Sequence, residues 1–176
     1  MAAKDKKVLY ISQEIFPYLP ESDLAHVARY LPEHIQNAGH DVRIFMPRYG
    51  LVNERRNQLH EVIRLSGINV IVDDYDHPLV IKVASIPSTR IQVYFIDNPD
   101  LFGRKSLFGP ASEGAPSDNA DRSIFFIRGV FEAIKNLRWI PDLIHCLGWF
   151  SALAPVYLKT AYKDDPYFER AKVIFS

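Results

Sequence analysis

The chain has 176 residues, of which 48% are apolar, and its 21 lysine and arginine residues balance its 21 aspartate and glutamate residues. This length and composition suffice for one domain with a full hydrophobic core. The zero net charge gives no electrostatic reason to expect nucleic acid or an anionic membrane surface as a partner.

The sequence lacks the patterns that are typical of export or membrane insertion. Its apolar runs are too short to span a bilayer, and residues 1–7 are polar and basic without the apolar core of a signal peptide behind them. Cys146 is the only cysteine, so an internal disulfide is impossible. These features favour a cytoplasmic location.

Residues 7–49 have the pattern of a β-α-β unit. Lys7–Ser12 contains an unbroken apolar run, as expected of a parallel strand that is covered on both faces. A helix follows, with Ser22 placed to cap it and Gly39 placed to end it in a left-handed conformation. The apolar stripe of this helix comprises Leu24, Val27, Ala28, Leu31, Ile35 and Ala38. With residues 42–46 as the returning strand, the unit predicts an α/β fold, a doubly wound Rossmann-like parallel sheet with helices on both faces.

The middle of the chain predicts antiparallel strands inserted into this sheet. Residues 68–72 and 79–86 are rich in β-branched side chains, and they predict a β-hairpin with a six-residue connection, residues 73–78. Residues 59–65 and 90–97 predict two further strands. We interpret the aspartates of the connection as a solvated turn rather than a metal site, because such side chains satisfy turn backbones by themselves. The sequence therefore predicts no metal and no cofactor.

The last part of the chain predicts a loop over residues 101–116 and then a long helix, which Asp118 is placed to cap. We weigh that capping role against sugar binding. A strand over residues 143–146, a helix over 149–160 and a final strand over 172–176 follow.

Five segments are similar to the bacterial glycogen synthases and plant starch synthases that use ADP-glucose. Residues 12–17 (SQEIFP) resemble the S-E-x-x-P that follows the first strand of that family, and residues 39–49 resemble its G-H-x-V and P-x-Y. Residues 96–102 and 118–122 resemble I-D-x-P-x-L-[YF] and D-N-x-x-R. Residues 141–158 resemble P-D-[IV]-[IVL]-H-x-H-D-W-x-[TSA]-[AG]-L-x-P-x-[YL]-L.

The resemblance implies both an architecture and an activity. It implies one half of a two-domain GT-B glycosyltransferase, with residues 1–176 forming a single amino-terminal domain that ends before the family's second catalytic segment. The implied hexosyltransferase activity is the transfer of glucose from ADP-glucose to an α-1,4-glucan. ADP-glucose and α-glucan are then the implied partners, together with a carboxyl-terminal domain or partner protein.

The candidate substrate-binding residues are those at which the resemblance and side-chain polarity coincide. They are Glu14, Asp118, Asn119 and His145. His145 matches the first histidine of the family's H-x-H-D, and we weigh a ligand contact against a hydrogen-bonded core histidine. Leu147 and Gly148 stand in place of the second histidine and the aspartate.

The loop after the first strand departs from the family pattern. The family's K-T-G-G falls on Pro20, Glu21, Ser22 and Asp23, so two possible anions replace a cation. A carboxylate about 6 Å from a phosphate oxygen, at an effective dielectric constant near 20, repels it by roughly 3 kcal/mol, about a hundredfold in affinity. We therefore expect this chain alone to bind ADP-glucose weakly or not at all and to be inactive, and we assign no catalytic residue.

Three hypotheses follow from the sequence. The first is a synthase-like glycosyltransferase domain with a degenerate donor loop. The second is a non-catalytic relative that binds glucan or a partner protein in glycogen metabolism, with aromatic side chains stacking on sugar rings. Those side chains are Phe16, Tyr18, Phe102 and Phe108. The third is an unrelated doubly wound binding domain, since a fold alone does not define a function.

Overall fold

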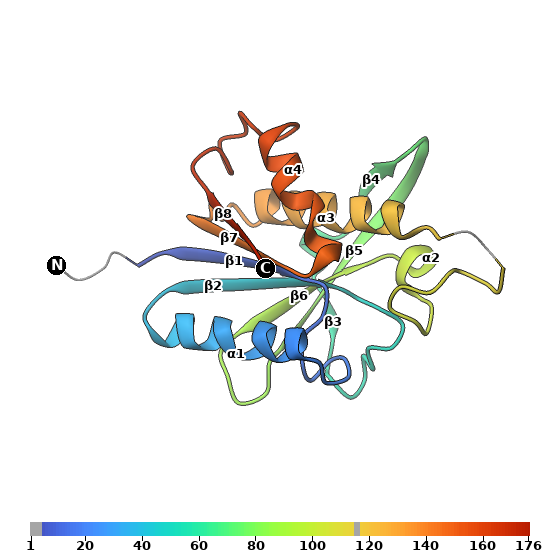
Figure 1. Ribbon diagram of the computed structural model, residues 1–176, viewed down its shortest axis with the longest axis horizontal. Coiled ribbons are helices and arrows are strands. Elements are labelled where there is room, and N and C mark those ends of the chain that lie inside the picture. Colours follow the sequence, from blue (N-terminus) through green and yellow to red (C-terminus); the bar gives the residue numbers. More distant parts are fainter. Residues whose placement is uncertain (1–4, 115–116) are drawn as a thin grey trace.

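The computed structural model describes residues 5–114 and 117–176. An open mixed sheet forms its centre, with the strand order β3-β5-β6-β2-β1-β7-β8 and with β4 paired to β5 (Figure 1). The strands are β1 (Lys7–Ser12), β2 (Asp41–Pro47), β3 (His60–Glu61), β4 (Ile68–Val72), β5 (Tyr75–Ser85), β6 (Gln92–Asp97), β7 (Leu143–Leu147) and β8 (Lys172–Phe175). The α-helices are α1 (Asp23–Asn37), α2 (Pro99–Phe102), α3 (Asn119–Asn136) and α4 (Leu153–Lys159), and the 3₁₀ helices are η1 (Ile63–Leu65) and η2 (Trp149–Ser151).

Strand β1 lies at the centre of the parallel part of the sheet. It pairs in parallel with β2 on one edge and with β7 on the other, and this parallel region continues to β6 and β8. Leu9 and Ile11, which alternate with Val8 and Tyr10 along β1, are fully buried. The predicted α/β sheet with a strand covered on both faces is therefore confirmed.

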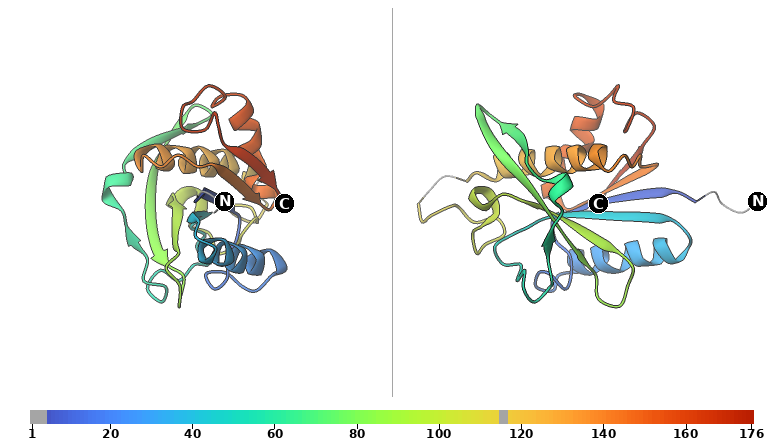
Figure 2. Two further views of the ribbon diagram at one scale, coloured as in Figure 1. Left: turned by 90° about the vertical axis from the view of Figure 1, so that its left-hand side faces the viewer. Right: turned by 180° about the vertical axis from the view of Figure 1, so that it is seen from behind.

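Helix α1 covers one face of the sheet, whereas α3 and α4 cover the other (Figures 1 and 2). The predicted helix ends are confirmed: the Ser22 hydroxyl accepts a hydrogen bond from the Ala25 N–H at 3.0 Å, and Gly39 has φ = +97°. The predicted stripe is partly wrong, because Val27 is 45% exposed. Ala25, Ala28 and Pro32 are the buried residues of α1, so small side chains let the helix approach the strands closely.

The inserted hairpin has a shorter connection than the sequence predicts. Val72 pairs directly with Tyr75, so Asp73 and Asp74 alone form the turn, and the six-residue connection is wrong. Asp73 has φ = +54°, a conformation that aspartate tolerates better than most residues. The polar residues that follow continue as β5 because they lie on an exposed part of the hairpin, where strand pairing does not require apolar side chains.

Three further elements differ from the prediction. The strand predicted over residues 59–65 is reduced to β3, and η1 follows it. The segment after β6 begins with α2, which Asn98 caps by accepting hydrogen bonds from the N–H groups of Asp100 and Leu101. The helix predicted over residues 149–160 is divided into η2 and α4, with Pro155 in the first turn of α4, where a missing N–H is tolerated. None of the helices in the described part of the chain is long and apolar enough to cross a membrane.

Replacing Ser22 with alanine tests the helix cap. The Ser22 hydroxyl also donates to Glu14 Oε1 at 2.7 Å, so Ser22→Ala removes two hydrogen bonds from the start of α1. We expect the free energy of unfolding to fall by about 1 to 2 kcal/mol in urea denaturation. The exposed Ser112→Ala is the control, and equal effects of the two variants would contradict the capping role.

Candidate functional site at the carboxyl edge of the sheet

The loops that follow β1, β2, β6 and β7 lie at one edge of the sheet, on the side of α2 in Figure 1. Because β1 leads to α1 and β7 leads to α4, these two neighbouring strands send the chain to opposite faces. In doubly wound folds the crevice formed at such a reversal is the usual ligand site. We therefore built the candidate site outward from the ends of β1 and β7.

The side chain of Gln13 bridges the carboxyl ends of β1 and β7. Gln13 donates its backbone N–H to the Leu147 carbonyl at 3.2 Å, and its Oε1 accepts from the Phe150 N–H at 3.3 Å. A Cβ on Gly148, which has φ = +82°, would lie 2.3 Å from Gln13 Oε1. Gln13 and Gly148 are thus sterically matched, and this contact between distant segments was missed in the sequence.

Glu14 joins the loop after β1 to the start of α1. This carboxylate is half-buried and accepts a hydrogen bond from the Ser22 hydroxyl, while the Ser12 hydroxyl donates to the Glu14 carbonyl at 2.7 Å. The pKa of the Tyr49 hydroxyl is raised mainly by burial, lowered by the charge of Arg122 and raised by that of Glu14. The charge of Glu14 is therefore close enough to the Tyr49 hydroxyl to raise its pKa.

Asp118 and Asn119 fasten the segment after α2 to α3. Asp118 is at the N-cap position, but the structure gives its side chain no capping hydrogen bond, so the capping prediction is wrong. Its Oδ1 instead accepts from Arg104 Nη1 at 2.8 Å and its Oδ2 from Arg104 Nη2, and these hydrogen bonds lower the pKa of the Asp118 carboxyl. Asn119 donates to the Phe108 carbonyl at 2.8 Å. Both residues thus hold the loop down over the edge of the sheet.

Arg122 is a fully buried cation and is not among the site residues that the sequence predicts. Its Nε donates to the Leu101 carbonyl and its Nη1 to Asn119 Oδ1, both at 2.7 Å. The guanidinium carbon lies 5.1 to 5.7 Å from the centroids of three rings. These rings belong to Tyr49, Phe102 and Phe150. The available signal was the D-N-x-x-R spacing, which places Arg122 one helical turn after Asp118.

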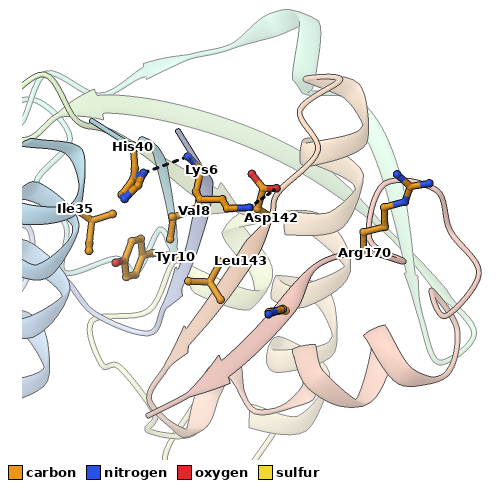
Figure 3. A pocket seen from close by; sticks show the side chains of 9 residues that line it. Lys6, Val8, Tyr10, Ile35, His40, Asp142, Leu143 and Arg170 are labelled. Atoms are coloured by element: carbon orange, nitrogen blue, oxygen red, sulfur yellow. Dashed lines mark hydrogen bonds and ion pairs between the residues drawn. The ribbon is translucent and has the colours of Figure 1, made fainter. Parts of the chain in front are cut away.

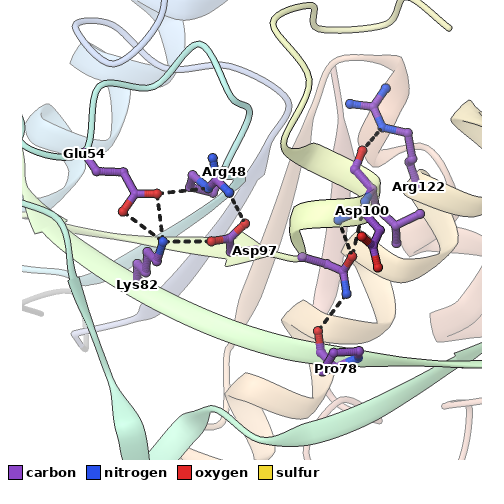
Figure 4. Close-up of polar contacts among 9 residues, drawn as sticks. Arg48, Glu54, Pro78, Lys82, Asp97, Asp100 and Arg122 are labelled. Atoms are coloured by element: carbon purple, nitrogen blue, oxygen red, sulfur yellow. Dashed lines mark hydrogen bonds and ion pairs between the residues drawn. The ribbon is translucent and has the colours of Figure 1, made fainter. Parts of the chain in front are cut away.

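A second polar group lies where β2 and β6 end and β5 passes beside them (Figure 4). The buried carboxylate of Asp97 is 2.7 Å from Arg48 Nη2 and 2.9 Å from Lys82 Nζ, and Glu54 contacts both cations at 3.3 and 2.7 Å. Burial lowers the pKa of Lys82, but hydrogen bonds to Glu54 and Asp97 raise it above its ordinary value overall. These alternating charges attach the inserted strands to the parallel sheet.

His145 lies within β7, facing Tyr10 of β1. The two ring centroids are 5.4 Å apart, and His145 Nε2 is 3.0 Å from the Ser176 hydroxyl oxygen. Burial lowers the pKa of His145, so its imidazole is neutral near pH 7. A neutral imidazole that is half-buried and hydrogen-bonded fits the core interpretation, and it is also able to donate a single hydrogen bond to a ligand.

The loop carrying Pro20 and Glu21 borders a cavity of about 380 Å³. Glu21 is 71% exposed, and its Oε2 lies 3.7 Å from His26 Nε2. Arg56 from the loop after β2 lines the same cavity. The carboxylate that replaces part of the family's K-T-G-G is therefore solvated and has a cationic neighbour across the cavity.

The geometry defines an α/β domain in which loops at the carboxyl edge of the parallel strands carry the candidate site residues. The profile of the family described as the starch synthase catalytic domain matches residues 7–176, and the chain belongs to that family.

Similar proteins and a similar structure support this assignment. The glycogen synthase of Chlorobium limicola is 39% identical over 177 residues, covering all of this chain and 36% of that protein, and the glycogen synthase of Chlorobaculum tepidum is 41% identical over 175 residues, covering 99% and 36%. The catalytic domain of starch synthase IV from Arabidopsis thaliana, bound to ADP and acarbose, matches with a TM-score of 0.82 at 22% identity, covering 98% of this chain and 34% of that one. The chain thus spans about a third of the length of these relatives.

These findings confirm the predicted family and fold, and the unrelated doubly wound domain is excluded. The roles of Glu14, Asp118, Asn119 and His145 in substrate binding stay predictions.

Comparing two glycines tests the match between Gln13 and Gly148. Gly148 and Gly67 have similar positive φ values of 82° and 85°, but a Cβ on Gly67 has no heavy atom within 4 Å. We expect Gly67→Ala to lower the free energy of unfolding by about 1 kcal/mol, and Gly148→Ala by about 1 kcal/mol more, because the Gln13 carboxamide must move and lose its hydrogen bond from the Phe150 N–H. Urea denaturation of both variants measures the difference, and equal losses would show that Gln13 does not crowd residue 148.

The Arg104–Asp118 pair predicts a pH-dependent contribution to stability. Because the folded-state pKa of Asp118 is depressed below its ordinary value of 3.8, the stabilisation is present above that value and is lost as the pH falls through the folded-state pKa. We expect Asp118→Asn to be less stable than the wild type at pH 7 and to approach it below about pH 3.8. A constant difference from pH 7 to pH 3 would contradict this assignment.

Proposed function

We propose that this chain is the amino-terminal domain of a retaining glycosyltransferase that transfers glucose from ADP-glucose to an α-1,4-glucan. This proposal rests on one observation: the chain matches relatives that are named glycogen synthases over essentially its whole length. None of these findings favours the non-catalytic alternative. We expect the activity to be cytoplasmic, where a nucleotide sugar is available.

The proposed reaction requires positive charge for the diphosphate leaving group and hydrogen bonds for the sugar. The neutral imidazole of His145 and the carboxamides of Gln13 and Asn119 are suited to hydrogen-bonding sugar hydroxyls. Glu14 is suited to orient a hydroxyl through the carboxylate oxygen that Ser22 does not use.

We propose that a second domain, or a partner protein in its place, completes the active site. The relatives are almost three times as long as this chain, which supports this proposal. Strand β8 has β7 on one edge, and its Val173 and Phe175 are 37% and 52% exposed in a groove beside α4. Apolar residues at the edge of a parallel sheet are normally covered, so this surface is suited to a further polypeptide segment.

The electrostatic repulsion between a diphosphate and the loop that carries Glu21 (the donor loop) is weaker than the sequence alone predicts. At the effective dielectric constant of a solvated position, about 80, the repulsion from a carboxylate about 6 Å away falls to roughly 0.7 kcal/mol, about threefold in affinity. The exposure of Glu21 and the position of Arg56 on the same cavity favour this smaller value. We propose a donor loop that weakens ADP-glucose binding moderately.

Incorporation of radiolabelled glucose from ADP-glucose into glycogen tests the proposed function. The full-length gene product is expected to elongate glycogen, whereas the 176-residue chain alone is expected to be inactive. Absence of incorporation by the full-length product, under conditions where the Chlorobium limicola enzyme is active, would refute the proposed activity.

Neutralising Glu21 tests the donor loop separately. We expect Glu21→Gln to raise the affinity for ADP-glucose about threefold at low ionic strength, with a smaller gain at 0.5 M salt because screening weakens the repulsion. Glu61→Gln, on the exposed strand β3, is the matched control. Isothermal titration calorimetry of the full-length product gives both values, and equal affinities in the two variants would show that Glu21 does not face the donor.

A further inference from the structure

A groove of about 360 Å³ lies at the amino ends of β1 and β7, at the opposite edge from the candidate site (Figure 3). Helix α1 borders it on one side and the segment before β8 on the other. Its lining residues are Lys6, Val8, Tyr10, Ile35, His40, Asp142, Leu143, Arg170 and Lys172. Nothing in the proposed reaction uses this groove.

The floor of the groove is apolar. Val8 and Tyr10 of β1, Leu143 of β7 and Ile35 of α1 form it, and their side chains come from elements that pack against one another. Its volume falls within the range that is typical of small-molecule sites, about 300 to 1,000 Å³. The floor therefore offers a preformed surface for a planar or aliphatic group.

The rim of the groove carries mainly hydrogen-bond donors and positive charge. Lys6, Arg170 and Lys172 are cations, but Lys6 Nζ lies 3.7 Å from Asp142, and the 90% exposed Arg170 lies 3.5 Å from Glu169 and points away from the floor in Figure 3. Lys172 is therefore the main cation that the rim offers to a ligand. The His40 Nδ1 accepts a hydrogen bond from the Lys6 N–H at 3.1 Å, so the proton of a neutral His40 is on Nε2, which is then a donor.

Asp142 is the one carboxylate among the lining residues of the groove. It accepts from the Lys7 N–H at 2.8 Å and lies 3.7 Å from Lys6 Nζ. Its charge is thus already engaged with neighbouring groups, and the rim as a whole favours a ligand that brings negative charge and accepts hydrogen bonds.

We infer that this groove binds a small organic anion with an apolar body, such as an aromatic or aliphatic carboxylate, sulfonate or phosphate ester. The apolar body lies on Ile35 and Leu143, above the nearly buried Val8 and Tyr10, and the anionic group lies toward Lys172 and the Nε2 of His40. The Tyr10 ring of the floor also contacts the ring of His145, which is a candidate site residue. Tyr10 therefore lies between the ligand and His145.

Binding of 8-anilinonaphthalene-1-sulfonate to the folded chain tests this inference. We expect saturable fluorescence enhancement with one site, and amide chemical-shift changes in ¹H–¹⁵N spectra at residues 6, 40 and 143. The uncharged N-phenyl-1-naphthylamine is expected to bind at least tenfold more weakly, because it lacks the anionic group. Non-saturable enhancement, or shifts centred on residues 155–168, would overturn the inference.

A matched pair of charge reversals locates the site. Lys172→Glu is expected to weaken binding of the sulfonate about tenfold, because it replaces attraction by repulsion at the rim. Lys159→Glu changes the same charge in the groove between α4 and β8 and is expected to alter binding by less than about twofold. Thermal melting checks that both variants are folded, and equal affinities of the two variants would refute the site. The result is independent of the proposed glucosyl transfer, which is measured separately.

Discussion

The parallel pairing of β1 with β2 on one edge and β7 on the other is the constraint on which the rest of the structure depends. Because β1 continues into α1 and β7 continues into α4 on opposite faces of the sheet, the chain diverges at the carboxyl ends of β1 and β7. Gln13 fills the space that this divergence leaves, and Gly148 is the residue that permits it. The position of the site is therefore a consequence of strand order rather than of any single side chain.

The loops at this edge of the sheet are held by buried polar groups, most of whose atoms are paired, although Arg122 Nη2 and the Tyr49 hydroxyl have no hydrogen-bond partner among the described residues. Arg122 binds a carbonyl and an amide oxygen while three aromatic rings surround it, and Asp97 is paired with two cations. A buried charge without such partners is strongly destabilising, so these contacts fix the loops in one arrangement. The same arrangement leaves Glu14 and His145 in partly exposed positions near the strand ends.

The sequence predicts those features of the structure that depend on local pattern. It does not predict the features that depend on contacts between distant parts of the chain. The continuous apolar run of β1, the Ser22 cap and the left-handed Gly39 follow from strand and helix periodicity, and all three are confirmed. The two-residue turn at Asp73 and Asp74 was missed because the polar residues after it pair as a strand on an exposed surface. The capping prediction for Asp118 is wrong because Arg104, fourteen residues away, competes for its carboxylate. The contact of Gln13 with Gly148 joins segments that only the folded sheet brings together.

The residues that differ from the family motifs have local structural roles in this fold. Ser22, at a position of the K-T-G-G, caps α1 and donates to Glu14, and Gly148, in place of the family's aspartate, makes room for a carboxamide from the neighbouring strand. Glu21 is exposed beside His26, and Arg56 lines the same cavity, so the local charge is not simply reversed. Arg104 and Arg122 are already engaged within the domain. We therefore expect the positive charge that a diphosphate leaving group requires to come from Arg56 and from the proposed second domain, and for this reason the proposed transfer is expected only of a longer product.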